Sequence, residues 1–235
     1  MSSNPTSIHH DKVRETLVRL ETRIAERFPD SNLRKVCNQL IEVTDDTEEN
    51  VAWIDRPLWL VRGITYTFIG FSVLGIGYGF TLVNYDFENP DFELIIATLE
   101  SLINDLVLIG AAIFFLLTLE NRMKRSRALK KLNELRALAH VIDMHQLTKD
   151  PTAVGPAGNT EHSPDRTMSN YDLQRYLDYC SEMLSLIGKV AALYSQSLPD
   201  DVVVGAANDI ESLCTGLSRK IWQKLIILHG ELPRG

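Results

Sequence analysis

The chain has 235 residues, 45% of them hydrophobic, and a formal net charge of -7. This negative charge excludes nucleic acid as an expected partner, because binding a phosphate backbone requires a basic face. The three cysteines form no Cys-x-x-Cys pair, which favours reduced, buried thiols over a disulfide framework or a zinc ribbon. The common catalytic motifs are missing from the sequence, so we expect neither an enzyme nor a cofactor.

Residues 1–56 are predicted to form cytoplasmic helices, without a cleavable signal peptide because their start lacks an apolar core. Apolar residues spaced by four and three predict a first helix over 8–27. A second helix would begin at a cap formed by Asp30 or Ser31 and break at the acidic stretch 44–50. The two apolar stripes are Val13, Leu17, Leu20 and Ile24, then Leu33, Val36, Cys37, Leu40 and Ile41.

Residues 57–84 are predicted to form a first transmembrane helix. The stretch 63–83 carries no charge and is long enough to cross the hydrocarbon core, which takes about 20 helical residues. Its glycines would let a second helix approach closely, either this chain's own second span or a span of a neighbouring subunit. These packing residues are Gly63, Gly70, Gly75, Gly77 and Gly79.

A short acidic external loop, 85–93, is predicted to lead into a second transmembrane helix, 94–119. The loop has no Lys or Arg, whereas six basic residues follow the second span. This bias places both termini in the cytoplasm, and we expect a bacterial inner membrane. A buried core helix of a soluble protein is the alternative, but it leaves the charge bias unexplained. The basic residues expected to contact anionic lipid are Arg122, Lys124, Arg125, Arg127, Lys130 and Lys131.

Four polar residues near the outer end of the second span form the main candidate site. Glu93, Glu100 and Asn104 are spaced by seven and four, so they share one helix face, and Asp105 adjoins it. If several subunits turned this face inward, the carboxylates would concentrate cations at an outer mouth. The alternative is a solvated first turn outside the membrane.

The second span is predicted to continue without a stop through a cytoplasmic extension, 120–149, as one helix from about Phe92 to Gln146. Near its end, His140 and Asp143 are three positions apart and can meet on one face. They are weak candidates for a metal site. There are two other interpretations. This polar helix end could contact the C-terminal helices, or it could sense pH or bind a ligand.

A flexible linker rich in proline and glycine, 150–167, is predicted to precede a C-terminal antiparallel helical hairpin, 168–235. Ser197 with Asp200 has the pattern of a capping box for the last helix, which Gly230 would end. The apolar seams of the extension and the hairpin are Ala128, Leu132, Leu135, Ala139 and Ile142; Leu173, Leu177, Cys180, Leu184, Ile187, Ala191 and Tyr194; and Val203, Ala207, Ile210, Cys214, Leu217, Ile221 and Leu228.

These elements predict an all-α protein, with a two-span transmembrane helical hairpin and a cytoplasmic helical bundle. The coiled-coil-like seams fit either an intramolecular bundle or packing between subunits. We expect a non-enzymatic, self-associating integral membrane protein, a homo-oligomer in the lipid bilayer. Its bundle would act as an interaction or sensing module for a cytoplasmic protein partner. The alternative function is an oligomeric cation channel lined by the second transmembrane helix.

Overall fold

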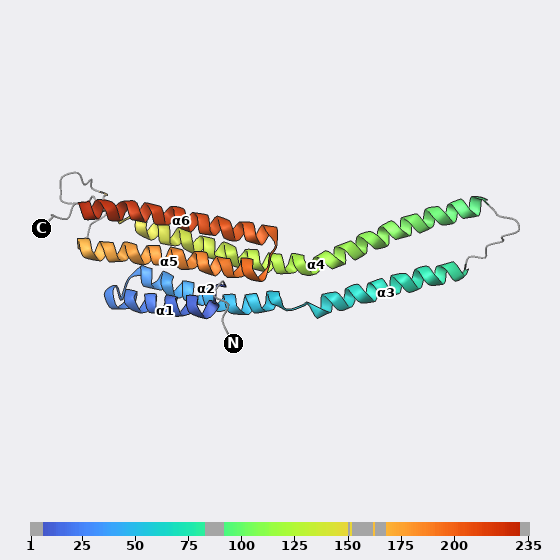
Figure 1. The fold of residues 1–235 in the computed structure, drawn as a ribbon, viewed down its shortest axis with the longest axis horizontal. Coiled ribbons are helices and arrows are strands. Elements are labelled where there is room, and N and C mark those ends of the chain that lie inside the picture. The colour runs from blue at the N-terminus through green and yellow to red at the C-terminus, as the bar shows by residue number, and fades with distance from the viewer. Residues whose placement is uncertain (1–6, 83–91, 150, 152–161, 163–167, 231–235) are drawn as a thin grey trace. The chain divides into compact units, whose positions relative to one another are not determined.

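The computed structural model describes residues 7–82, 92–149, 151, 162 and 168–230. In these ranges the chain is helical and contains no strand, which confirms the predicted all-α fold class (Figure 1). The helices are α1 (His10–Arg27), α2 (Asn32–Asp55), α3 (Trp59–Leu82), α4 (Phe92–Leu147), α5 (Asn170–Ser197) and α6 (Asp201–Gly230).

The chain divides into two compact units. The first, the bundle unit, comprises Met1–Asp55 and Arg125–Gly235, and the second, the apolar unit, comprises Arg56–Lys124. The predicted linker 150–167, apart from two isolated positions, and the part of the acidic loop at 85–91 lie outside the described residues.

Helix α5 lies at the centre of the bundle unit, where it contacts α1, α2 and α6 (Figure 1). The second half of α4 is attached to α6 by polar contacts. Arg136 donates to Asp209 at 3.4 Å, and the Lys224 ammonium donates to the Gln146 carbonyl oxygen at 2.5 Å. Burying one Leu or Ile side chain fully stabilises the folded state by about 1.5–3 kcal/mol. Core packing therefore dominates the stability of this unit.

The predicted apolar stripes of α1, α4, α5 and α6 are confirmed, because every residue named in them is buried in the core. The stripe of α2 is buried too, except that Ile41 is partly buried and packs against the core. The long helix predicted from the second span into the extension is also confirmed. Helix α4 has 56 residues, and at 1.5 Å per residue it is roughly 84 Å long.

The predicted break at 44–50 is wrong, because α2 runs through this stretch. Three polar side chains there face inward and donate to backbone carbonyls one turn earlier. The Thr44 and Thr47 hydroxyls bond to Leu40 and Val43, each at 2.7 Å, and Asn50 bonds to Asp46 at 2.6 Å. These bonds satisfy the buried polar atoms, so the stretch can stay helical against the core.

The predicted cap of α6 is also wrong. Ser197 is the last residue of α5, and Asp200 caps α6 by accepting from the backbone N–H groups of Val202 and Val203 at 3.1 and 3.3 Å. A carboxylate in this position satisfies two donors that the first helical turn leaves free. The expected cap of α2 at Ser31 is confirmed, since its hydroxyl accepts from the Arg34 N–H at 3.2 Å.

The apolar unit contains α3 and the first part of α4. Two stretches, within Asn32–Gly79 and Ile96–Leu147, are long and apolar enough to cross a membrane, and almost nothing in them is buried. The charge-poor part of the first stretch is α3, which Pro57 separates from α2. A core helix of a soluble protein buries its apolar side chains. Here Phe71 is 72% exposed, so this chain does not cover them.

Candidate functional site

The described residues contain one charged cluster that joins the start of α3 to α4, and we call it the Glu120 cluster. Arg62 donates to both carboxylate oxygens of Glu120, at 2.8 and 3.2 Å. The Lys124 ammonium lies 3.0 Å from the same carboxylate, one helical turn away, and the Leu58 backbone N–H donates to it at 3.4 Å. Glu120 and Lys124 are buried, whereas about half of the Arg62 side chain is exposed.

These contacts keep Glu120 ionised. The hydrogen bonds from Arg62, from Lys124 and from the Leu58 N–H outweigh burial, and together they lower the pKa of Glu120 to about 2. A carboxylate that holds its charge over the physiological pH range cannot act as a general acid. The cluster is therefore suited to fixing two helix ends together and unsuited to proton transfer. Sequence reasoning missed it, because Arg62 and Glu120 are 58 positions apart.

The four residues of the predicted cation pathway are all exposed on the first turns of α4. Glu93, Glu100 and Asn104 lie in one continuous helix, so their spacing does place them on one face, with Asp105 beside it. A cation pathway needs copies of this face to meet, so it stays a prediction.

The five packing glycines of α3 face open space. A Cβ atom built on any of them would meet no other described atom within 4 Å, and the same holds for Gly110 on α4. The chain's own second span therefore does not close on this glycine surface at side-chain distance. Packing against a neighbouring subunit stays a prediction.

The six basic residues predicted to contact lipid fall into two groups. Four of them are bonded inside the protein. Lys124 belongs to the Glu120 cluster, Arg125 donates to Asp200 at 2.9 Å, Arg127 donates to Asn50 at 2.5 Å, and Lys131 donates to Asp46 at 3.0 Å. The other two are differently placed. Arg122 is exposed with its guanidinium over the Phe115 ring, and Lys130 is exposed.

The weak metal candidates do not form a ligand set. His140 is exposed, and the Asp143 carboxylate accepts from the Gln146 side-chain amide at 2.6 Å. Nowhere in the described ranges do three His, Cys, Asp or Glu side chains gather closely enough to hold a metal ion. Since the Gln146 carbonyl also accepts from Lys224 on α6, the contacts favour a polar helix end against the C-terminal hairpin.

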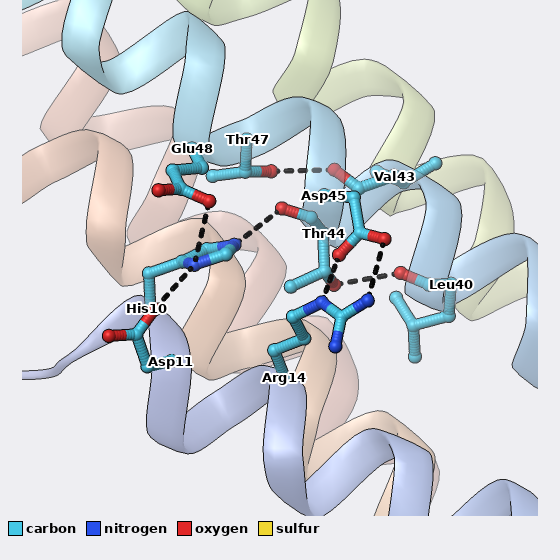
Figure 2. A network of polar contacts seen from close by, with 9 residues as sticks. All are labelled: His10, Asp11, Arg14, Leu40, Val43, Thr44, Asp45, Thr47 and Glu48. Atoms are coloured by element: carbon cyan, nitrogen blue, oxygen red, sulfur yellow. Dashed lines mark hydrogen bonds and ion pairs between the residues drawn. The ribbon is translucent and has the colours of Figure 1, made fainter.

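A second polar network links the first turn of α1 to α2 (Figure 2). The His10 ring nitrogen Nε2 lies 2.8 Å from the Thr44 carbonyl oxygen. A carbonyl oxygen can only accept, so this nitrogen carries the proton in that contact. The other nitrogen, Nδ1, is buried without a hydrogen-bond partner and lies 3.5 and 3.7 Å from Asp11 and Glu48.

The same helix faces hold a second pair in this network. Arg14 donates to both carboxylate oxygens of Asp45, at 2.6 and 3.2 Å (Figure 2). Beside His10 lies an open cavity of about 320 Å³ whose polar lining includes Glu48, Asp55 and Gln196. The sequence held a signal for this network, because His10 and Arg14 are one turn apart and α2 carries acids at a matching spacing.

The three thiols are buried and free, which confirms the prediction from their number. Burial raises the pKa of Cys37 and of Cys180 to about 12, and that of Cys214 to about 11. A thiol with so high a pKa is a poor nucleophile and a poor metal ligand at neutral pH. The cysteines therefore belong to the core of the bundle unit.

Comparisons with protein-family models, with curated proteins and with solved structures find no match to this chain.

Proposed function

We propose that this chain is a non-enzymatic, self-associating integral membrane protein whose cytoplasmic helical bundle is an interaction or sensing module. One observation carries the proposal. Two long apolar helices leave their side chains exposed, and soluble monomers rarely leave apolar patches of that size uncovered. Lipid would cover this surface, and the two spans would be 57–84 and 94–119.

The distribution of charge supports an orientation with both termini in the cytoplasm of a bacterial inner membrane. Arg56 and Arg62 precede the first apolar stretch, and the six basic residues follow the second. The Glu120 cluster includes one residue of each group, Arg62 and Lys124, and so joins the ends of the two stretches. Basic residues are retained on the cytoplasmic side during insertion.

Self-association is proposed to occur through the membrane helices. The seams of the cytoplasmic helices are already buried in the core of a single chain, which favours the intramolecular bundle over packing between subunits there. The glycine face of α3, in contrast, has room for a close neighbour. Small residues let membrane helices approach until their backbones contact. This close packing matters in a membrane, because the apolar lipid provides no hydrophobic force that brings helices together.

The test of self-association is the mass of the detergent-solubilised protein by light scattering. We expect the wild type to be larger than a monomer and G75L/G79L to shift toward monomer, because leucines would fill the close-contact surface. The matched control is G110L, which adds a leucine at an equally open glycine of α4 that is not one of the five packing glycines. A monomeric wild type, or equal masses for both variants and the wild type, would contradict the proposal.

The second candidate function is an oligomeric cation channel, favoured by the exposed acidic face of α4. We expect cation flux in liposomes that falls several-fold in E100Q and D105N, because each removes a charge from the outer mouth. The control is D209N, which removes an acid from the exposed surface of α6. Absence of flux across a range of pH and voltage would remove this candidate.

A further inference from the structure

The open cavity beside His10 lies between the start of α1, the end of α2 and the end of α5, and its volume is about 320 Å³. One face of α2 forms a wall of this cavity, because four residues that line it share one side of the helix. These wall residues are Glu48, Val51, Ala52 and Asp55. A cavity of this volume can hold a small molecule.

The wall is acidic at both ends and apolar in the middle. Glu48 and Asp55 carry exposed carboxylates, and seven positions separate them by about 10 Å along the helix axis. Asp55 is also the last residue of α2, and the C-terminal end of a helix carries a partial negative charge. Among the described residues that line the cavity there is no Lys or Arg, so the cavity attracts cations.

The Glu48 end of the cavity contains a hydrogen-bond acceptor that lacks a donor. Nε2 of His10 carries the ring proton in its contact with the Thr44 carbonyl oxygen, which leaves a lone pair on Nδ1. The carboxylates of Asp11 and Glu48, at 3.5 and 3.7 Å from Nδ1, are acceptors too and cannot satisfy it (Figure 2). Buried polar atoms are normally bonded, so a donor is missing between these three acceptors.

An ammonium group has the chemistry that this end of the cavity lacks. It carries three N–H donors and a positive charge. It can therefore donate to a ring nitrogen and to a carboxylate at the same time, and the carboxylate bond is charge-assisted. A second ammonium group would suit the carboxylate at the other end of the wall, and only an apolar chain would suit the middle.

We propose that this cavity binds a short aliphatic diamine in its diammonium form. One ammonium group binds Glu48 and Nδ1 of His10, and the other binds Asp55. The methylene chain lies against Val51 and Ala52. A four-carbon diamine is about 6 Å long between its nitrogens, and a hydrogen bond of about 2.8 Å at each end extends its reach to roughly 12 Å. This reach is comparable with the separation of the two carboxylates.

The inference gives a ligand class to the bundle that we propose as an interaction or sensing module. It does not depend on the membrane location, because every residue that lines the cavity belongs to the bundle unit.

The test is isothermal titration calorimetry of the full, detergent-solubilised chain with 1,4-diaminobutane. We expect saturable binding of the diamine. Butylamine has the same carbon chain and a single ammonium group, so it should bind about tenfold more weakly. Magnesium chloride, which supplies a divalent cation without an apolar chain, should not displace the diamine at equal concentration.

The variants test each part of the wall. E48Q and D55N should each weaken diamine binding about tenfold, because each removes the charged acceptor of one ammonium group. A52L should also weaken binding, since it fills the middle of the wall without changing a charge. The matched control is E49Q, which removes the neighbouring exposed carboxylate of α2 outside the cavity and should bind as the wild type does.

Three outcomes overturn the inference: no saturable binding, equal affinities for the diamine and butylamine, or equal losses of affinity in E48Q and E49Q. The last would report the charge of the α2 surface alone. Thermal unfolding of each variant checks that the fold is retained, and the oligomer mass is measured on the same samples. An oligomer that binds no diamine refutes this inference alone, whereas a monomer that binds it refutes self-association alone.

Discussion

Glu120 illustrates how one residue can hold two distant segments together. Its carboxylate has three donors, from Arg62, Lys124 and the Leu58 backbone, and its own side chain is 11% exposed. Removing its charge would leave Lys124, which is also buried, without a partner. Leaving a buried charge unpaired lowers the stability by more than the ion pair itself contributes to it.

We therefore expect E120Q to lower the free energy of unfolding by about 1–2 kcal/mol. This is less than the loss expected for a fully buried ion pair, because solvent screens the half-exposed Arg62. The measurement is the thermal unfolding of the detergent-solubilised protein. The control is E134Q, whose partner Lys131 keeps a second carboxylate in Asp46. A variant as stable as the wild type would show that the cluster is dispensable.

The pH dependence of stability is a second test of the Glu120 cluster. The pKa of Glu120 is lowered from 4.5 to about 2, so its contribution is complete above pH 4.5 and is lost as pH falls toward 2. Over this interval the wild type should lose more stability than E120Q. Parallel curves for the two proteins would contradict the assigned pKa.

At the scale of the element, α2 and α6 show where sequence patterns mislead. The run of acids and threonines at 44–50 resembles a turn, yet Thr44, Thr47 and Asn50 bond to their own helix and face the core. The Ser197 pattern resembles a capping box, yet Asp200 caps the helix while its other carboxylate oxygen accepts from Arg125. In both cases the packing of the helices decided which local pattern formed.

The cap gives the prediction at this scale. D200A should lower the free energy of unfolding by about 1–2 kcal/mol, because it removes the acceptor for two backbone donors and the partner of Arg125. D200N should recover part of the loss, since its amide oxygen still caps the helix. S197A should stay within about 0.5 kcal/mol of the wild type. Urea or thermal unfolding of the three variants decides whether Asp200 or Ser197 is the cap.

At the scale of the whole molecule, burial differs sharply between the two units. The bundle unit buries its seams in one core, whereas the apolar unit leaves long apolar helices uncovered by this chain. That contrast carries the proposal that lipid covers the apolar unit. The oligomer mass and the flux assay each test a different part of this view.

The sequence by itself determined the fold class, the length of α4 and the apolar seams of the core, because apolar spacing and hydrocarbon thickness are local properties that a single chain displays. It also marked Asp30 or Ser31 as a cap, of which the structure shows Ser31, and the three thiols as buried. Only the tertiary structure decided which charged side chains are bonded inside the protein and which stay exposed. It paired Arg62 with Glu120 and joined His10 to Thr44, and it used four of the six basic residues inside the protein. Ion pairs between distant segments depend on how helices meet, and no periodicity along the chain encodes that geometry.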